Sequence, residues 1–169
     1  MIMRLLAGLF AMLFACLGAP ALAQQGDKLM PALAFEELRA IVTELDFDLI
    51  DEGVDEDGDY YFEVESDTGL LFYLYGASCD DTDPQKDCMG LNAVGSFTLD
   101  TDADMHVVMN AISYAFMKVY RSDDELKISR YVIFDGGIMR ENVKENVRIF
   151  AEIGDAIWSK LTNDDVLAD

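Results

Sequence analysis

Apolar and polar side chains alternate along residues 60–65 and again along 70–75, and this pattern limits the possible folds more than any other feature of the sequence. Successive side chains of a strand point to opposite faces, so a period of two residues indicates a strand with one dry face. A Thr-Gly turn signal at residues 68–69 separates the two segments. Since so short a connection joins antiparallel strands, the pattern predicts a β-hairpin.

Three tyrosines fall on the wet face of this predicted hairpin: Tyr61, Tyr73 and Tyr75. A tyrosine combines a large apolar ring with a polar tip, which suits a surface that contacts another molecule. We interpret the three as a candidate partner surface, either for a peptide or for a second copy of the domain. Ordinary cross-strand pairing of exposed tyrosines is the alternative.

The other segments complete the predicted order of helix, three strands, helix, two strands and helix. Helices with a single apolar stripe cover one side of a sheet, and strands joined by short turns pair antiparallel. We therefore predict an α+β fold with a single antiparallel sheet of about five strands and the helices on one side. The predicted helices are 32–45, 102–113 and 140–161, and the remaining predicted strands are 90–99, 114–120 and 126–134.

Glycines mark two special positions in the C-terminal part of the chain. Gly136-Gly137 breaks the chain directly before the last predicted helix. Gly154 lies on the apolar stripe of that helix, where it weakens the helix by about 1 kcal/mol relative to alanine. Its position on the buried stripe predicts close packing of the helix against the sheet.

The first 23 residues have the pattern of a secretory signal. Arg4 precedes an apolar run, and small residues at Ala21 and Ala23 suit a cleavage site after Ala23. We therefore expect a periplasmic protein whose mature form has no stable membrane insertion. A retained anchor, or a lipoprotein cut before Cys16, is the alternative. The predicted organisation is a signal peptide (1–23), a leader (24–31), a domain (32–161) and a polar tail (162–169).

Export would leave Cys79 and Cys88 as the cysteines of the mature chain. An even pair in an oxidising compartment predicts a disulfide, and the spacing does not fit a C-x-x-C redox pair. The two cysteines bracket a hairpin connection, where facing strand residues come close enough to be bridged. A weak calcium site among the carboxylates of this connection remains an alternative; these are Asp80, Asp81, Asp83 and Asp87.

The chain is strongly acidic, with a formal net charge of −21 at pH 7. Nucleic acids and anionic membrane surfaces are therefore not expected as partners. The charge is uneven, because residues 44–67 contain twelve acidic and no basic residues, whereas 118–160 contain eight of each. We interpret the acidic part either as a solubilising surface or as a docking surface for a cationic protein segment.

No motif indicates a catalytic or cofactor site. An EF-hand loop starting at Asp55 would need a glycine where Tyr60 stands and a glutamate where Ser66 stands, so Asp57-Gly58 is read as a hairpin turn. His106 is the only histidine, and no phosphate or dinucleotide fingerprint is present. We expect no catalytic residues, no metal and no cofactor.

Beyond these patterns, the segment MNAISYAFMKVYRSDDELKISRYVIFDGGIMRENVKENVRIFAEI resembles the YbjN family, described as candidate bacterial sensory transduction regulators. The resemblance spans about 33–161. It implies a fold similar to type III secretion chaperones, which are small acidic domains that bind extended protein segments, often as dimers. It also implies structural roles for Asn110, Gly136 and Gly137. The Asn-x-Trp-Asn motif of the family is incomplete here, since only Asn110 is kept.

Together these observations predict a non-enzymatic periplasmic domain that binds a protein partner, which includes a second copy of itself, in a chaperone-like or regulatory role. A small-ligand or calcium-sensing domain is one alternative. A carboxylate-based hydrolase is another, although among 33 acidic residues some pair will always resemble a catalytic pair.

Overall fold

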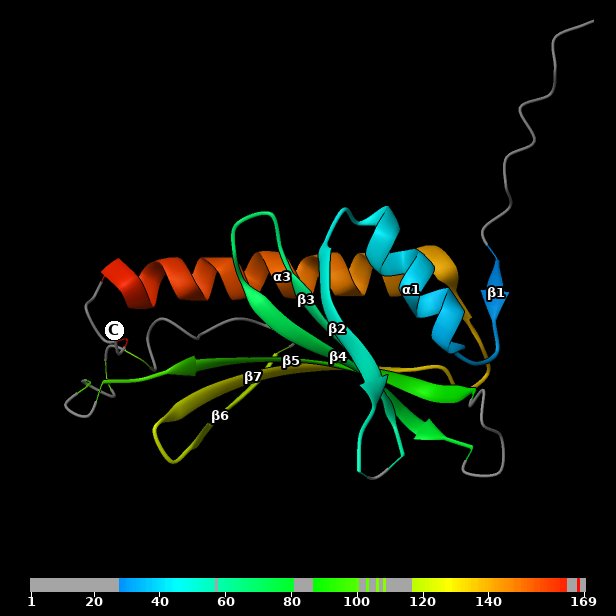
Figure 1. Ribbon diagram of the computed structural model, residues 1–169, viewed down its shortest axis with the longest axis horizontal. Coiled ribbons are helices and arrows are strands. Elements are labelled where there is room, and N and C mark those ends of the chain that lie inside the picture. The colour runs from blue at the N-terminus through cyan, green and yellow to red at the C-terminus, as the bar shows by residue number, and fades with distance from the viewer. Residues whose placement is uncertain are drawn as a thin grey trace, which may run out of the picture.

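The computed structural model describes residues 28–56, 58–80, 87–100, 103, 106, 108, 117–163 and 167. Most of this part of the chain is extended, and helices lie against one layer of strands (Figure 1). The larger sheet has six antiparallel strands in the spatial order β2 (Asp48–Val54), β3 (Tyr60–Glu65), β4 (Leu71–Cys79), β5 (Cys88–Thr98), β7 (Glu125–Ile133) and β6 (Lys118–Ser122). A two-stranded sheet pairs β1 (Leu29–Met30) with β8 (Ile138–Met139), and the helices whose bounds lie within the described residues are α1 (Phe35–Glu44) and α3 (Arg140–Asn163).

The predicted α+β fold with a single sheet of about five strands is wrong, because the described chain is mostly β and forms two sheets. The sequence interpretation missed β2, β1 and β8. β2 is an edge strand whose residues are mostly exposed on both faces, so it has no dry face and no period of two. β1 and β8 have two residues each, which is too short for any periodic signal.

One face of the six-stranded sheet carries the hydrophobic core, and both helices pack on that face (Figure 1). Phe35, at the start of α1, meets Phe62 of β3 with ring centroids 4.7 Å apart. Phe150 of α3 meets Phe72 of β4 at 5.4 Å. The apolar positions of the strands alternate with polar ones. The apolar side chains therefore face the core, and the side chains between them line the opposite face of the sheet.

Helix α3 lies across the strands of the sheet and buries one stripe of side chains against them. Gly154 lies on this stripe over Leu70, and a Cβ atom added to it would come within 2.4 Å of the Leu70 Cδ2 atom. The missing side chain therefore allows the helix to approach the sheet closely at this point. The stripe consists of Val143, Val147, Phe150, Ala151, Gly154, Ile157 and Leu161.

The chain enters α3 through the turn at Gly136 and Gly137, whose φ angles are +79° and +91°. These left-handed conformations favour glycine, and a Cβ atom on Gly137 would also lie 3.1 Å from Leu29. Of the predicted helix 102–113, only three residues are described, and His106 and Val108 are helical among them. Asn110 lies outside the described residues.

Candidate interaction surface on the open sheet face

The face of the six-stranded sheet opposite the two described helices carries a row of tyrosines that crosses several strands. We call it the open face. Register places Tyr61 of β3 opposite Tyr75 of β4, and Tyr73 of β4 opposite Val94 of β5. The row continues on the far strands with Tyr131 of β7 and Tyr120 of β6. Together with the residues between them, the described residues of the open face are Tyr61, Tyr73, Tyr75, Val94, Asn92, Ser129, Tyr131, Lys127 and Tyr120.

The three tyrosines predicted as a partner surface form one ring cluster. Tyr73 and Tyr75 stack with ring centroids 5.8 Å apart and an angle of 21° between the planes. Tyr61 lies 6.5 Å from each of them. All three side chains are partly exposed. The alternation in the sequence therefore brings these three residues together, and their role in binding is developed below.

The tyrosines at the two sides of this face lie close to glycines of a neighbouring strand. A Cβ atom on Gly53 of β2 would come within 3.1 Å of the Tyr61 ring. A Cβ atom on Gly90 of β5 would come within 2.7 Å of the Tyr131 hydroxyl oxygen. At either position the tyrosine side chain would have to shift to admit a larger residue. Both tyrosine side chains thus lie close to the neighbouring strand and keep accessible surface.

Carboxylates border the tyrosine cluster on the side of β2 and β3. The Tyr61 hydroxyl donates a hydrogen bond to Asp51 Oδ2 at 2.8 Å, and this bond is the main reason why the pKa of Tyr61 is raised. Burial, followed by a hydrogen bond to Glu63, raises the pKa of Tyr73 to about 12. Burial, followed by the charges of Asp55 and Glu63, raises the pKa of Tyr75. The three phenols are therefore neutral and sit in a negative local potential.

Charge is distributed unevenly across the open face, because the sheet order separates the acidic part of the sequence from the part with both acidic and basic residues. β2 and β3 belong to the acidic stretch 44–67 and form one edge, whereas β7 and β6 form the other. On this second side the Lys118 ammonium lies 4.7 Å from the centre of the Tyr120 ring, and Lys127 pairs with Glu125 at 3.0 Å. The face thus changes from acidic to mixed across its width.

Sequence reasoning did not find the whole of this surface. Asp51 belongs to β2, the strand that the alternation missed. Tyr131 and Lys127 lie on a predicted strand, and their alternation with Leu126 and Ile128 already places them on its wet side. What the sequence lacked was the register that sets β7 beside β5, because a long connection separates the two strands in the chain.

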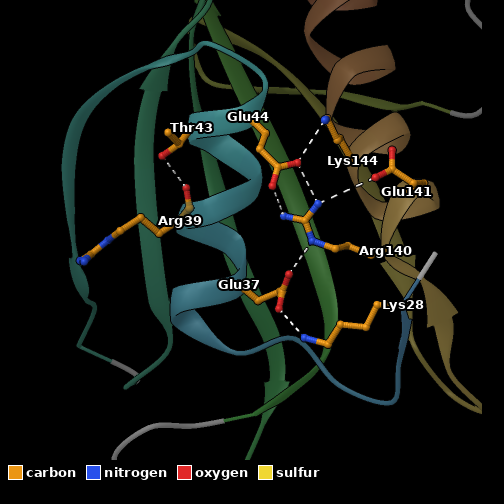
Figure 2. Close-up of polar contacts among 8 residues, drawn as sticks. All are labelled: Lys28, Glu37, Arg39, Thr43, Glu44, Arg140, Glu141 and Lys144. Atoms are coloured by element: carbon orange, nitrogen blue, oxygen red, sulfur yellow. Dashed lines mark hydrogen bonds and ion pairs between the residues drawn. The ribbon is translucent and has the colours of Figure 1, made fainter. Parts of the chain in front are cut away.

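A second polar cluster, built around Arg140, lies away from the open face, where the start of α3 meets α1 (Figure 2). The Arg140 guanidinium bonds to Glu37 Oε1 at 2.5 Å and to both oxygens of Glu44 at 2.7 and 2.8 Å. Lys28 bonds to Glu37 at 2.6 Å, and Lys144 bonds to Glu44 at 3.1 Å. These contacts join α1, the N-terminal strand segment and α3.

The backbone at the start of α3 is also tied to the N-terminal segment. The residue before the helix is Met139, which offers no oxygen to the free N–H groups of the first turn. The Arg140 backbone N–H instead donates to the Lys28 carbonyl oxygen at 2.9 Å. Hydrogen bonds from Arg140 and then Lys144 lower the pKa of Glu44 to about 2, and those from Lys28 and Arg140 lower the pKa of Glu37.

The predicted disulfide between Cys79 and Cys88 is confirmed. The two residues face each other at the end of the β4–β5 hairpin, with Cα atoms 3.9 Å apart. Cys88 is fully buried, and its backbone exchanges two hydrogen bonds with Leu33, at 2.8 and 2.9 Å. The bridge therefore fixes the hairpin end where the segment leading into α1 crosses it.

The described residues give no support to a metal or small-molecule site. They contain no group of three or more histidine, cysteine, aspartate or glutamate side chains placed to hold a metal ion. Asp81 and Asp83, two of the carboxylates considered for the alternative calcium site, lie outside the described residues. A cavity of about 230 Å³ lies between the end of α1 and α3, which is smaller than the ~300–1,000 Å³ typical of ligand pockets.

Two of the charged residues that line this cavity, Arg148 and Glu152, pair with each other. Arg148 also forms an ion pair with Glu145.

Within the described ranges, no helix is both long enough and apolar enough to cross a membrane.

Comparisons with known proteins relate this chain to others by fold. No family model matches the sequence, and no curated protein is similar to it in sequence. The chain is similar in structure to YbjN of E. coli, described as a candidate transcription regulator, with a TM-score of 0.58, 13% identity and coverage of 83% of this chain and 99% of that one. It is also similar to an uncharacterized protein from Methanothermobacter thermautotrophicus, with a TM-score of 0.52, 11% identity and coverage of 76% and 96%. At these identities the likeness shows a YbjN-like fold.

Proposed function

We propose that this chain is an exported, non-enzymatic domain that binds a protein partner on the open face of its sheet, in a chaperone-like or regulatory role. The observation that carries the proposal is the cluster of Tyr61, Tyr73 and Tyr75. These rings lie together on a face where core packing does not require them, since the core occupies the other side of the sheet. Aromatic residues on an accessible face are typical of protein interfaces.

Export is supported by the chemistry of the cysteines. A buried disulfide persists in an oxidising compartment and is rare in the cytoplasm. Together with the signal-like first 23 residues, it favours the periplasm as the location. The structural likeness to YbjN supports a regulatory role, because that neighbour is described as a candidate regulator of transcription. Direct contact with nucleic acid is disfavoured by the net charge of −21.

The proposal is tested by crosslinking in the native envelope, followed by purification of the full chain. The test variant replaces Tyr61, Tyr73 and Tyr75 with serine, and a second variant replaces them with phenylalanine to keep the rings. Trp158→Ser is the control, because Trp158 is an exposed aromatic residue of α3, on the helix side of the sheet. Thermal melting establishes that each variant is folded.

We expect the serine variant to lose the crosslinked polypeptide, and the phenylalanine variant and the control to keep it. Equal recovery of the same polypeptide by the wild type and a folded serine variant would refute the proposed surface. Loss of the polypeptide in the Trp158 control instead would place binding on the helix side.

A further inference from the structure

The acidic side of the open face offers a cation both aromatic rings and carboxylates within a small area. Tyr61 lies close to Gly53 of β2, and its side chain is partly exposed. Asp51 accepts the hydrogen bond from the Tyr61 hydroxyl, and Glu63 lies opposite Asp51 on the neighbouring strand. An aromatic ring face with carboxylates at its edge attracts a guanidinium or ammonium group by two independent effects, the ring quadrupole and the ion pair.

Three carboxylates on this side, Asp51, Glu63 and Glu65, form no ion pair within the described part of the chain. In contrast, Glu37, Glu44 and Glu52 each pair with a lysine or arginine. The basic residues of the chain lie mainly on α3 and on β6 and β7. The negative charge of this side is therefore available to a partner.

We infer that the side of the open face formed by β2, β3 and β4 recognises arginine or lysine side chains of an extended polypeptide segment. This inference rests on the proposed function and names the chemistry of its partner. In an extended segment every second side chain points the same way, so basic residues at alternate positions would all face the sheet. Arginine suits the site best, because its planar guanidinium stacks on a ring and pairs with a carboxylate at once.

Charge complementarity favours a basic segment over a second copy of the chain as the occupant. Two copies would each bring a net charge of −21, and bringing them face to face would oppose association at low salt. The same negative potential would attract a basic segment.

The inference is tested with three nine-residue peptides that alternate serine with arginine, glutamine or glutamate. Binding to the full mature chain is measured by fluorescence anisotropy at low and high salt. The test variant neutralises the acidic side of the face as Asp51→Asn, Glu63→Gln and Glu65→Gln. The control variant removes the same amount of charge elsewhere as Asp123→Asn, Asp124→Asn and Asp135→Asn, at exposed positions in the β6–β7 turn and after β7.

We expect only the arginine peptide to bind, and its affinity to fall with increasing salt. The test variant should weaken binding about tenfold, as expected for the loss of several exposed ion pairs, and the control less than about threefold. Equal weakening by both variants would overturn the inference, because it would show attraction to net charge alone. Equal binding of the three peptides would overturn it as well.

The outcomes also separate this inference from the proposed function. If no peptide binds, while the native crosslink still depends on the tyrosines, the partner is not basic and the proposed surface stands. If light scattering shows a dimer that the tyrosine-to-serine variant dissolves, and no peptide binds, the occupant is a second copy and the inference fails. If neither the crosslink nor any peptide depends on this face, both fail.

Discussion

Removing the charge of Arg140 should destabilise the protein by about 2 kcal/mol, because its guanidinium holds α1 and the N-terminal segment against α3. Arg140→Met keeps the aliphatic stem and deletes three hydrogen bonds to two carboxylates. Hydrogen bonds to charged groups contribute about 1.5–3 kcal/mol each when they are shielded. The Arg140 side chain is only 15% exposed, but Glu44 is 43% exposed, so solvent screening reduces the total.

Arg148→Met is a matched control on the same helix. Arg148 also pairs with two carboxylates, Glu145 and Glu152, but both belong to α3 and all three side chains are well exposed. Because Arg148 links no separate elements, its replacement should change the free energy of unfolding little. Urea unfolding of both variants, followed by circular dichroism, measures the difference. Equal losses for Arg140→Met and Arg148→Met would refute the reasoning.

The effect of Arg140→Met should also depend on pH. The pKa of Glu44 is lowered in the folded state from its ordinary value of 4.5 to about 2, so its contribution is fully present above about pH 5. That contribution is lost as the pH falls towards 2. The difference in unfolding free energy between the wild type and Arg140→Met should therefore shrink over this range. A difference that stays constant from about pH 6 to about pH 2.5 would contradict the assigned ion pairs.

Three further predictions concern the bridge, the helix packing and the tyrosines. Replacing Cys79 and Cys88 with alanine should lower the free energy of unfolding by about 2–3 kcal/mol, and a reductant should bring the melting curve of the wild type to that of the variant. Gly154→Leu should cost about 1–3 kcal/mol by urea unfolding, because even a Cβ atom there would clash with Leu70; an unchanged midpoint would show that α3 does not approach the sheet closely. Tyr73→Phe should remove a phenolate absorbance step near pH 12, since burial and Glu63 raise the pKa of Tyr73; loss of a step near pH 10 would disprove that environment.

Much of the sheet could be predicted because half of it faces a core. The segments that became β3, β4, β5 and β7 each have an apolar side that packs under the helices, so their period of two was visible in the sequence. The stripe of α3 was visible for the same reason. Cys79 and Cys88 were paired correctly because they bracket the connection between two predicted neighbouring strands.

What the sequence could not show depends on contacts between distant segments. β2 is held by its hydrogen bonds to β3 and buries little apolar surface, so its sequence lacks the alternation of a strand with one dry face. β1 pairs with β8, which directly follows the Gly136-Gly137 turn and is distant from β1 in the chain. The Arg140 cluster joins residues 96 and 103 positions apart, and surface charges carry no signal of such distant partners. For the same reason, the sequence could not place Asp51 beside the tyrosines.

The most direct test of the account is photocrosslinking from a single position on the open face. A photoreactive residue in place of Val94 would lie between Tyr73 and Ser129, and one in place of Ser159 would lie on the exposed side of α3. In the native envelope, the account predicts a polypeptide adduct from position 94 that is lost when Tyr61, Tyr73 and Tyr75 are replaced with serine, and no such adduct from position 159. Adducts from position 159 alone, or an adduct from position 94 that ignores the tyrosines, would contradict it.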